Sequence, residues 1–345
     1  MILFSSCKED EIDTPVFNEN YGEGMYIITD IGVSFYDNTD SLAVVQNQIF
    51  KSVNNTTIIN PKKIRFNGTK AYIIADNYIL TANVNTFENK EEINGFSNPV
   101  YIDFISHKRI FVVDKGDSKV KAVDLTSLDI TSQIEAGDST QPVFIVSNSY
   151  KSFVLNGGGL STQVKDSTVM VIEYRDNLVQ LADLTGVLPV GDNPNSAVFS
   201  GNLKVLCQGI YDSINSINNT ESSLSNINQY SNQVYSTDIL SGIYNARNLV
   251  SNKSASVLFF TASNGIYTMN PNGVGVSQID PIVSDILFVQ SEQYNLTDST
   301  TAISNMLYVN DAYNSPNTIY KYNLVLSSYV DTIIVDGNVR DINFY

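Results

Sequence analysis

Polar side chains recur at one position of this chain, directly after short apolar runs such as RIFVVD and KVLCQG. Aspartate, asparagine and glutamine can exchange hydrogen bonds with a polar ligand, and paired carboxylates can act as acid and base in a lyase or hydrolase. Asp and Asn also suit hairpin turns, so a purely structural role stays open for each of them. The candidate ligand-binding residues of this kind are Asp30, Asp76, Asp114, Asn156, Gln208, Asn310 and Asp311.

Three tyrosines complete the candidate site. Tyr211 and Tyr230 lie near the ends of a Ser- and Asn-rich insertion, Ile210 to Gln233, and Tyr313 lies in the stretch Asn310 to Asn317. Tyrosine offers rigid amphipathic contact area, and Ser and Asn offer adaptable polar contacts. The insertion is therefore typical of a recognition loop, although its composition is equally typical of disorder.

Enzyme chemistry has few residues to use in this sequence. The single histidine, His107, lies in the short turn of FISHKRI. No Ser-His-Asp or Cys-His group can be assembled around it, and the His and Cys spacings of a metal site are missing. Cys207 lies in an apolar run, as expected for a small buried residue. We therefore expect a protein that is not an enzyme and that holds no cofactor or metal.

The elements that position these residues repeat seven times. An apolar strand, often entered through proline, returns at intervals of 37 to 56 residues. Periods near 40 to 50 residues that contain several short strands are typical of β-propeller blades. Val, Ile, Tyr and Phe are abundant and long helical periodicities are missing, which also favours an all-β fold. The central apolar residues of the seven copies are Ile64, Ile102, Ile145, Ala197, Leu249, Ile286 and Ile342.

The last copy, Arg340 to Tyr345, has no strands after it. We expect its partners at the other end of the chain, in Met25 to Asp30, Gly32 to Asp37 and Leu42 to Phe50. Pairing of the N- and C-terminal strands in one blade closes the ring and removes an unpaired sheet edge. The sequence thus predicts a single seven-bladed β-propeller over residues 24–345.

Loop lengths indicate which face of this ring binds a ligand. In a propeller, the loops from second to third strands and from outer strands to the next inner strand open on one face, which we call the mouth. We expect long insertions on the mouth face at Gly157 to Ser167, Ile210 to Gln233 and Asn310 to Asn317, and one on the opposite face at Gln290 to Asn305. Loops longer than closure requires are commonly functional.

The charge of the chain bears on its partners. The formal net charge is -16, with 36 Asp and Glu against 20 Lys and Arg. Binding to nucleic acid requires clustered Lys and Arg that neutralise phosphates, so we expect no nucleic-acid partner.

The N-terminus resembles the end of a bacterial lipoprotein signal. An apolar run and small residues precede Cys7, which would be acylated, although a basic region and a full apolar core are missing. The segment after it, Lys8 to Glu11, is similar to the acidic export tag of surface lipoproteins in Bacteroidetes. We expect residues 1–23 to be a signal remnant, acylated cysteine and tether, and the protein to be lipid-anchored in the outer membrane and to face the cell exterior. An incidental cysteine in a frayed terminus is the alternative.

One segment, Gly191 to Gly209, resembles the repeat of the YncE-like seven-bladed propellers. The opening strands, Asn18 to Asp37 and Lys70 to Glu88, are similar to those of a family of Bacteroidetes surface lipoproteins. That family includes cobalamin-binding propellers that pass vitamin B12 to a TonB-dependent transporter. The resemblance implies the fold, and it implies a corrinoid ligand and a TonB-dependent outer-membrane transporter as candidate partners.

The leading hypothesis from sequence is therefore a surface lipoprotein that captures a corrinoid or another small molecule at the propeller mouth. An interaction scaffold that recognises an envelope protein or a glycan is the alternative. A carboxylate-based lyase or hydrolase at the mouth is a third class.

Overall fold

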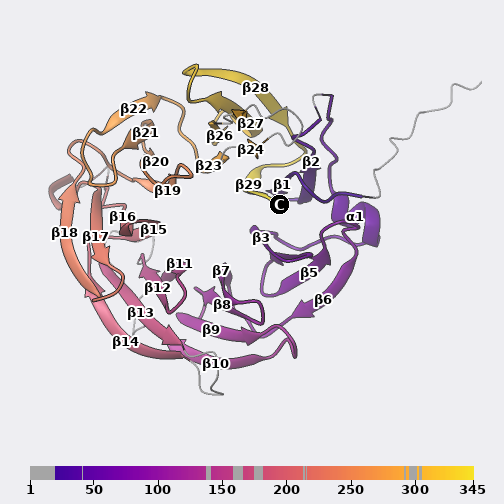
Figure 1. The fold of residues 1–345 in the computed structure, drawn as a ribbon, viewed down its shortest axis with the longest axis horizontal. Helices are drawn as coiled ribbons and strands as arrows, with labels where there is room; N and C mark the ends of the chain where they lie inside the picture. The colour runs from indigo at the N-terminus through magenta and orange to yellow at the C-terminus, as the bar shows by residue number, and fades with distance from the viewer. Residues whose placement is uncertain are drawn as a thin grey trace, which may run out of the picture.

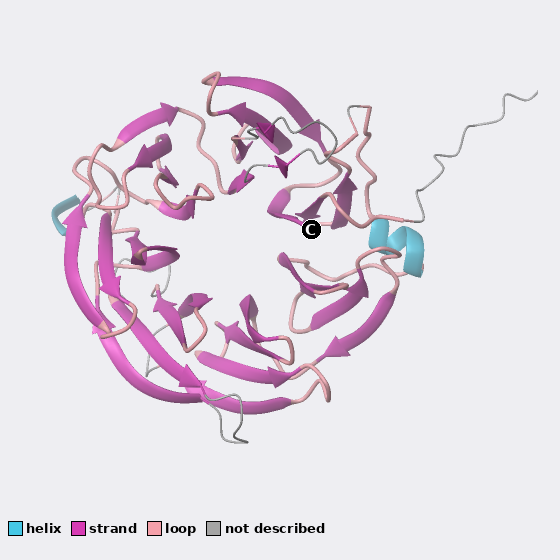
Figure 2. Ribbon diagram, viewed as in Figure 1, coloured by secondary structure: helices cyan, strands magenta, loops and turns pink. Residues whose placement is uncertain are grey.

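The chain folds into a ring of β-sheets around a central opening (Figure 1). This computed structural model describes residues 20–40, 42–136, 141–157, 166–174, 182–212, 214, 216–290, 293–294, 301–302 and 305–345. Cys7 and most of the expected tether lie outside these residues. Strands dominate the described residues, and the helices found there are α1 (Ile49–Asn54) and one 3₁₀ turn at Ser216–Asn218 (Figure 2). In the described part of the chain, no helix has the length and apolar character needed to span a membrane.

Seven of the sheets are the blades of a β-propeller, and six of these blades have four antiparallel strands. From the channel outward, blade two contains β3 (Lys63–Asn67), β4 (Lys70–Ile74), β5 (Ile79–Asn83) and β6 (Asn89–Ile93). Blade three contains β7 (Pro99–Ser106), β8 (Arg109–Asp114), β9 (Lys119–Asp124) and β10 (Ile130–Glu135). Blade four contains β11 (Pro142–Ser147), β12 (Lys151–Asn156), β13 (Thr168–Tyr174) and β14 (Ala182–Pro189).

The other half of the ring follows the same order. Blade five contains β15 (Pro194–Ser200), β16 (Asn202–Cys207), β17 (Ser223–Asn228) and β18 (Gln233–Ile239). Blade six contains β19 (Arg247–Ser251), β20 (Leu258–Ala262), β21 (Gly265–Met269) and β22 (Ser277–Asp280). Blade seven contains β23 (Leu287–Gln290), β26 (Met306–Asp311), β27 (Ser315–Asn323) and β28 (Ser328–Ile334), and a separate pair is formed by β24 (Gln293–Tyr294) and β25 (Thr301–Ala302).

Blade one closes the ring. Its strands are β29 (Val339–Phe344), β1 (Met25–Thr29) and β2 (Gly32–Tyr36), so the C-terminal strand lies next to the channel and pairs with the first strand of the chain. Ile27 is opposite Ile342 in this antiparallel register. The predicted fold and the predicted pairing of the two chain ends are confirmed.

The hydrophobic core lies between neighbouring blades. The seven central residues of the repeat, from Ile64 to Ile342, are all less than 8% exposed and point into these interfaces. In the interface of blades two and three, for example, Ile74 and Ile79 pack with Ile102 and Ile110. Since successive residues of a strand face opposite ways, the neighbours of each central residue face the other adjacent blade, and they also line the channel.

One predicted strand of blade one is wrong. Leu42 to Phe50 does not form an outer strand: Gln46 makes an isolated bridge with Phe35, and α1 begins at Ile49. Gln48 has a left-handed φ of 51°, which ends the extended backbone. Ile49 and Phe50 then turn inward and become buried, so apolar residues that resemble a strand supply a helix to the core.

The predicted insertion of blade five, Ile210 to Gln233, is also partly wrong. It contains the third strand of the blade, β17, and the segment Val234 to Asp238 that follows it lies in the outer strand β18. The segment SLSNIN was assigned to an insertion because it is rich in Ser and Asn. Its Leu224 and Ile227 are buried, and Ser225 Oγ hydrogen-bonds Thr237 Oγ1 at 2.8 Å, which satisfies the polar side chain within the sheet.

Candidate functional site

The polar residues predicted to bind a ligand at the mouth serve the scaffold. Asp114 is fully buried, and its carboxylate accepts hydrogen bonds from the backbone N–H groups of Ser97 (2.8 Å) and Asn98 (2.7 Å). It also forms a 2.7 Å ion pair with the buried Lys121. Burial raises the pKa of Asp114, but hydrogen bonds from Lys121 and these amides outweigh it and hold the pKa below its ordinary value. Asp114 therefore fixes the loop that enters β7.

Asn310 has the same role in blade seven. Its side chain is 2% exposed, and Oδ1 accepts hydrogen bonds from the N–H groups of Asp285 and Ile286, both at 3.0 Å. Asn310 thus fixes the loop before β23 in the same way that Asp114 fixes the loop before β7. A residue whose polar atoms already bond the backbone has little capacity left for a ligand.

The remaining polar candidates lie at the mouth with partners of their own. Asn338 N–H donates to Asp30 Oδ1 at 2.8 Å, and Asn60 Nδ2 donates to Asp76 Oδ1 at 3.0 Å. Gln208 Nε2 donates to Asn245 Oδ1 at 3.1 Å.

Asn156 and Asp311 complete this set. Asn156 is buried and donates to Thr168 Oγ1 at 3.0 Å, and Asp311 Oδ1 accepts from the N–H groups of Tyr313 and Asn314. These hydrogen bonds agree with a structural role of the polar side chains in turns and loops, and a role in ligand binding stays a prediction.

The three tyrosines do not share one surface. Tyr211 follows β16 on the mouth face, is 49% exposed and packs on Tyr244 with ring centroids 5.6 Å apart. Tyr313 is 76% exposed in a three-residue turn between β26 and β27, so the expected long insertion at Asn310 to Asn317 is wrong. Tyr230 lies in the turn between β17 and β18, on the opposite face, where its carbonyl accepts a hydrogen bond from Lys151 Nζ.

The other predicted insertions are only partly visible. Residues 158–165 of the blade-four loop lie outside the described residues, as do most of residues 291–304. The predicted placement of Tyr230 at the mouth is wrong because β17 occupies the middle of the segment assigned to the insertion.

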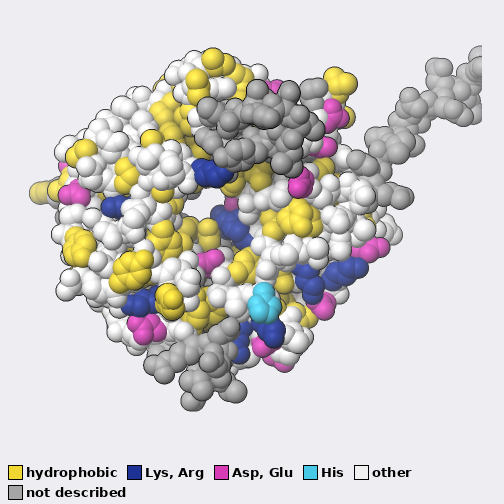
Figure 3. All heavy atoms as spheres, in the orientation of Figure 1, with side chains coloured by type: hydrophobic (Ala, Val, Ile, Leu, Met, Phe, Trp, Pro, Cys, Tyr) yellow, Lys and Arg dark blue, Asp and Glu magenta, His cyan; other side chains and the backbone are white. Residues whose placement is uncertain are grey.

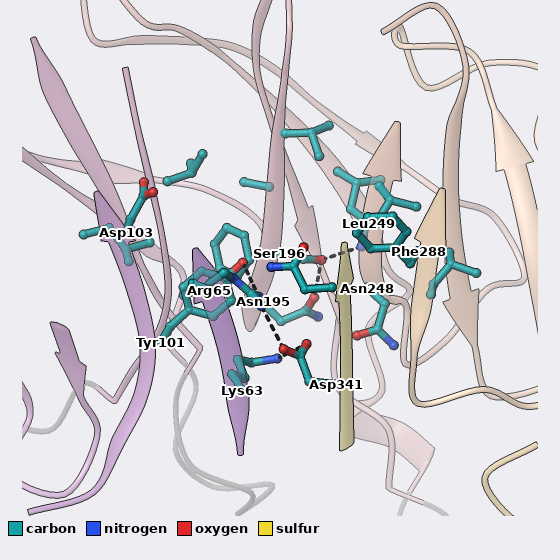
Figure 4. A pocket seen from close by; sticks show the side chains of 18 of the residues that line it. Lys63, Arg65, Tyr101, Asp103, Asn195, Ser196, Asn248, Leu249, Phe288 and Asp341 are labelled. Atoms are coloured by element: carbon teal, nitrogen blue, oxygen red, sulfur yellow. Dashed lines mark hydrogen bonds and ion pairs between the residues drawn. The ribbon is translucent and has the colours of Figure 1, made fainter. Parts of the chain in front are cut away.

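A concave site of about 560 Å³ lies in the central channel and is lined by all seven inner strands (Figure 4). Cavities of 300–1,000 Å³ are typical of small-molecule sites. Residues before each central apolar residue form an upper ring nearer the mouth, and residues after it form a lower ring. The upper ring is Lys63, Tyr101, Phe144, Ser196, Asn248, Asp285 and Asp341. The lower ring is Arg65, Asp103, Val146, Val198, Val250, Leu287 and Asn343.

Charged residues gather on the side of the channel formed by β29, β3 and β7, which we call the charged wall. Asp341 Oδ2 accepts hydrogen bonds from Arg65 Nη1 at 2.8 Å and from the N–H of Ile64 at 3.1 Å, and Lys63 Nζ lies 3.4 Å from Oδ1. The guanidinium of Arg65 also donates to Tyr101 Oη at 3.2 Å and lies 4.9 Å from the centre of that ring. Burial lowers the pKa of Arg65, but Asp341 and Tyr101 outweigh it and raise the pKa, so Arg65 stays charged.

Lys63 keeps capacity for a ligand. Its side chain is 30% exposed, and among the described residues its ammonium faces one carboxylate oxygen at 3.4 Å and the ring of Tyr101 at 5.5 Å. An ammonium has three donors, so at least one can point into the channel. Figure 3 shows Lys and Arg side chains at the edge of the central opening.

The channel differs in charge from the rest of the protein. The whole chain has 20 Lys and Arg against 36 Asp and Glu, whereas cations and carboxylates are equal in number in the described channel lining. The lining cations are Lys63, Arg65 and Arg340, and the lining carboxylates are Asp103, Asp285 and Asp341.

Asp103 sits in the lower ring of the charged wall. Burial raises the pKa of this carboxyl to about 6, although hydrogen bonds from Ser147 and the Phe104 amide and the charge of Arg65 oppose the shift. Its charge therefore changes within the physiological range, unlike that of an ordinary aspartate.

The opposite side of the channel, formed by β11, β15, β19 and β23, is the apolar wall. Its lower ring consists of Val146, Val198, Val250 and Leu287, and Phe144 lies above it. Ser196 and Asn248 are engaged with the scaffold: Ser196 Oγ accepts from Leu249 N–H, and Asn248 Nδ2 donates to Thr261 Oγ1, both at 3.0 Å. Asp285 is half-exposed and pairs with Arg247 at 3.2 Å.

Sequence reasoning missed the channel residues, and a signal for them existed. The repeat was aligned on its central apolar residue, and strand alternation places the two flanking positions on the other face. Reading Lys63 and Arg65 around Ile64, or Asp341 around Ile342, would have pointed to the channel.

Searches of known proteins support the fold. No protein-family model and no curated protein matches the chain. A quinoprotein alcohol dehydrogenase-like protein of Bacteroides thetaiotaomicron matches with a TM-score of 0.66 and 13% identity, over 95% of this chain and 79% of that one. The periplasmic gluconolactonase of Pseudomonas aeruginosa matches with a TM-score of 0.66 and 11% identity, over 93% and 98%. Hydrazine synthase of Kuenenia stuttgartiensis matches with a TM-score of 0.62 and 14% identity, over 83% and 90%.

These similarities define the protein as a seven-bladed propeller whose neighbours are of the lactonase-like and quinoprotein-like type. The fold is consistent with a scaffold that binds a ligand or a protein. The sequence-based prediction that the protein is not an enzyme is wrong as stated, because the similar propellers include a gluconolactonase and hydrazine synthase. Identities of 11–14% relate the folds and not the activities.

Proposed function

We propose that the protein binds a small organic anion, as ligand or substrate, in its central channel, with Lys63 and Arg65 as the anion-binding residues. The observation that carries the proposal is the placement of these two cations. They lie two residues apart on the same face of β3, and both are partly exposed and line the cavity of about 560 Å³. Arg65 is oriented by Asp341 and Tyr101, so its guanidinium needs little reordering to accept a ligand.

Electrostatics favour an anion at this position. A carboxylate or phosphate would form charge-assisted hydrogen bonds with the ammonium of Lys63 and the guanidinium of Arg65. Arg340, exposed at the mouth end of β29, places a third cation between solvent and Lys63. A path lined by cations raises the local concentration of anions, even in a protein whose net charge is negative.

Calorimetric titration with octanoate and with gluconate tests the proposal. At least one of these anions is expected to bind, and Lys63→Gln should weaken binding about tenfold or more, as expected for the loss of a charge-assisted hydrogen bond of about 1.5–3 kcal/mol. Lys90→Gln is the matched control, because Lys90 is a surface lysine paired with Glu88 at 3.1 Å, away from the channel lining. Lack of binding by both anions, or equal loss in both variants, would contradict the proposal.

The cellular setting also remains a proposal. Acylation of Cys7, display on the outer membrane and transfer of a corrinoid to a TonB-dependent transporter are supported by the sequence resemblance. Titration with cyanocobalamin addresses this idea separately from the channel. Corrinoid binding that is unchanged in Lys63→Gln would locate it at the mouth, whereas an absence of heat at micromolar protein would remove it.

A further inference from the structure

The two walls of the channel present opposite chemistry to any occupant. Blade two lies across the ring from blades five and six, so Lys63 and Arg65 on β3 face Val198 on β15 and Val250 on β19 (Figure 1). Figure 4 shows Lys63, Arg65 and Tyr101 on one side of the cavity and Leu249 and Phe288 on the other.

The apolar wall contributes apolar side chains to the lining of the channel. Its lower ring comes from four successive blades, and Val146, Val198 and Val250 are only partly buried although they line the interior of the ring. These side chains pack against the cores between blades, and the part of each that stays exposed lines the cavity. Apolar surface of this kind gains free energy when a ligand removes it from water.

The polar groups beside this wall offer little to a ligand with many hydroxyls. Ser196 Oγ donates to Asn195 Oδ1 at 2.7 Å and accepts from Leu249 N–H. Asn248 Nδ2 donates both to Thr261 Oγ1 and to the Asp285 carbonyl. Hydroxyl groups pressed against valine without a partner would lose their hydrogen bonds to water, which is unfavourable.

We propose that the channel selects amphipathic organic anions, in which a carboxylate or similar oxyanion head is joined to an alkyl or aryl body, over polyhydroxylated sugar acids. The head binds Lys63 and Arg65, and the body lies along Val146, Val198 and Val250. This inference rests on the proposed anion site and specifies its ligand class.

A chain-length series tests the inference. Butanoate, hexanoate, octanoate and gluconate are titrated into the protein at one pH and ionic strength. Each methylene group buried on the apolar wall contributes about 0.8 kcal/mol at most, so affinity should rise by up to about fifteenfold for every two methylenes, and octanoate should bind far more tightly than gluconate.

Variants of the wall supply the second arm. Val198→Thr/Val250→Thr keeps side-chain shape but adds hydroxyls, and it should flatten the chain-length dependence while leaving butanoate affinity within about twofold. The matched control is Val187→Thr/Val330→Thr, two exposed valines on outer strands β14 and β28, which should leave the series unchanged. Thermal denaturation checks that each variant folds. The chain-length series on the wild-type protein tests the inference even if a variant does not fold.

The outcomes separate the two proposals. Gluconate binding as tightly as octanoate, or affinity independent of chain length, overturns the ligand class alone. An unchanged slope in Val198→Thr/Val250→Thr also overturns it, because the body would then lie elsewhere. If no carboxylate binds, or if Lys63→Gln binds all of them as wild type does, the anion site itself is wrong.

Discussion

The charged wall and the apolar wall of the channel are built from the same repeat. In each inner strand a central residue is buried between blades, and its two neighbours lie at the lining of the channel. On β3 these neighbours are Lys63 and Arg65, and on β15 they are Ser196 and Val198. The comparison teaches that packing restrains the central residue most strongly, so the flanking positions that line the channel can differ more from blade to blade. This variation can produce a binding site.

The charged wall differs from the apolar wall in a second way, because it includes the C-terminal strand β29, whose pairing with β1 closes the ring. Asp341, from the C-terminal strand, accepts the N–H of Ile64, and Asn343 Nδ2 donates to the Ile64 carbonyl at 3.0 Å. Both polar groups of Ile64 are thus held by side chains of β29. Binding chemistry and ring closure share residues on this wall, whereas the apolar wall bears no such seam.

The largest effect expected from this comparison is on stability. Asp341→Ala leaves the Ile64 amide and the Arg65 guanidinium without their partner in a largely buried position, so the free energy of unfolding should fall by about 2–4 kcal/mol. Asp285→Ala is the control on the apolar wall: its carboxylate pairs with Arg247, but both side chains are about half exposed, and the loss should stay below about 1 kcal/mol. Urea denaturation measures both, and equal losses would refute the distinction between the walls.

A smaller effect is expected from Asp103, which gives the charged wall its pH dependence. Because burial raises its pKa to about 6, lowering the pH from 7.5 to 5.5 neutralises this carboxylate near Arg65, and anion affinity should rise a few-fold. Asp103→Asn should bind more tightly at pH 7.5 and lose this pH dependence. Calorimetric titration with octanoate between pH 5.5 and 7.5 measures this pH dependence. If affinity changes with pH in the same way in wild type and Asp103→Asn, then Asp103 does not cause the change.

The raised pKa of Asp103 also makes the stability of the protein depend on pH. Its folded-state pKa is raised from 3.8 to about 6, so between these values the folded protein holds a proton that the unfolded chain has lost. Stability attributable to Asp103 is therefore greatest at low pH and declines as the pH rises from about 4 to 6. Asp103→Asn should remove that decline.

The sequence predicted those features of the fold that depend on repeated buried residues. The spacing of Ile64, Ile102 and Ile145 gave the blades, and the lone C-terminal strand gave the closure with Met25 to Asp30. Prediction was wrong where composition hid the pattern. The Ser- and Asn-rich β17 was mistaken for a loop, and this error moved Tyr230 to the wrong face.

The candidate site was harder to predict for a physical reason. Asp114 and Asn310 look like ligand residues in sequence, since nothing there reveals that backbone amides of the preceding loop occupy their oxygens. The cations of the channel carry no motif, because each blade contributes only one or two residues. They come together through ring closure, which brings Asp341 within 2.8 Å of Arg65, a residue 276 positions away.

The central claim is that the channel holds an amphipathic anion with its head on the charged wall. A crystal structure with 8-bromooctanoate tests this most directly, because the anomalous signal of bromine locates the end of the alkyl chain. We expect the carboxylate within about 3 Å of Lys63 Nζ and the Arg65 guanidinium, and the bromine against Val198 and Val250. Bromine at the mouth beside Tyr211 or Tyr313, or a carboxylate remote from Lys63 and Arg65, would contradict the account.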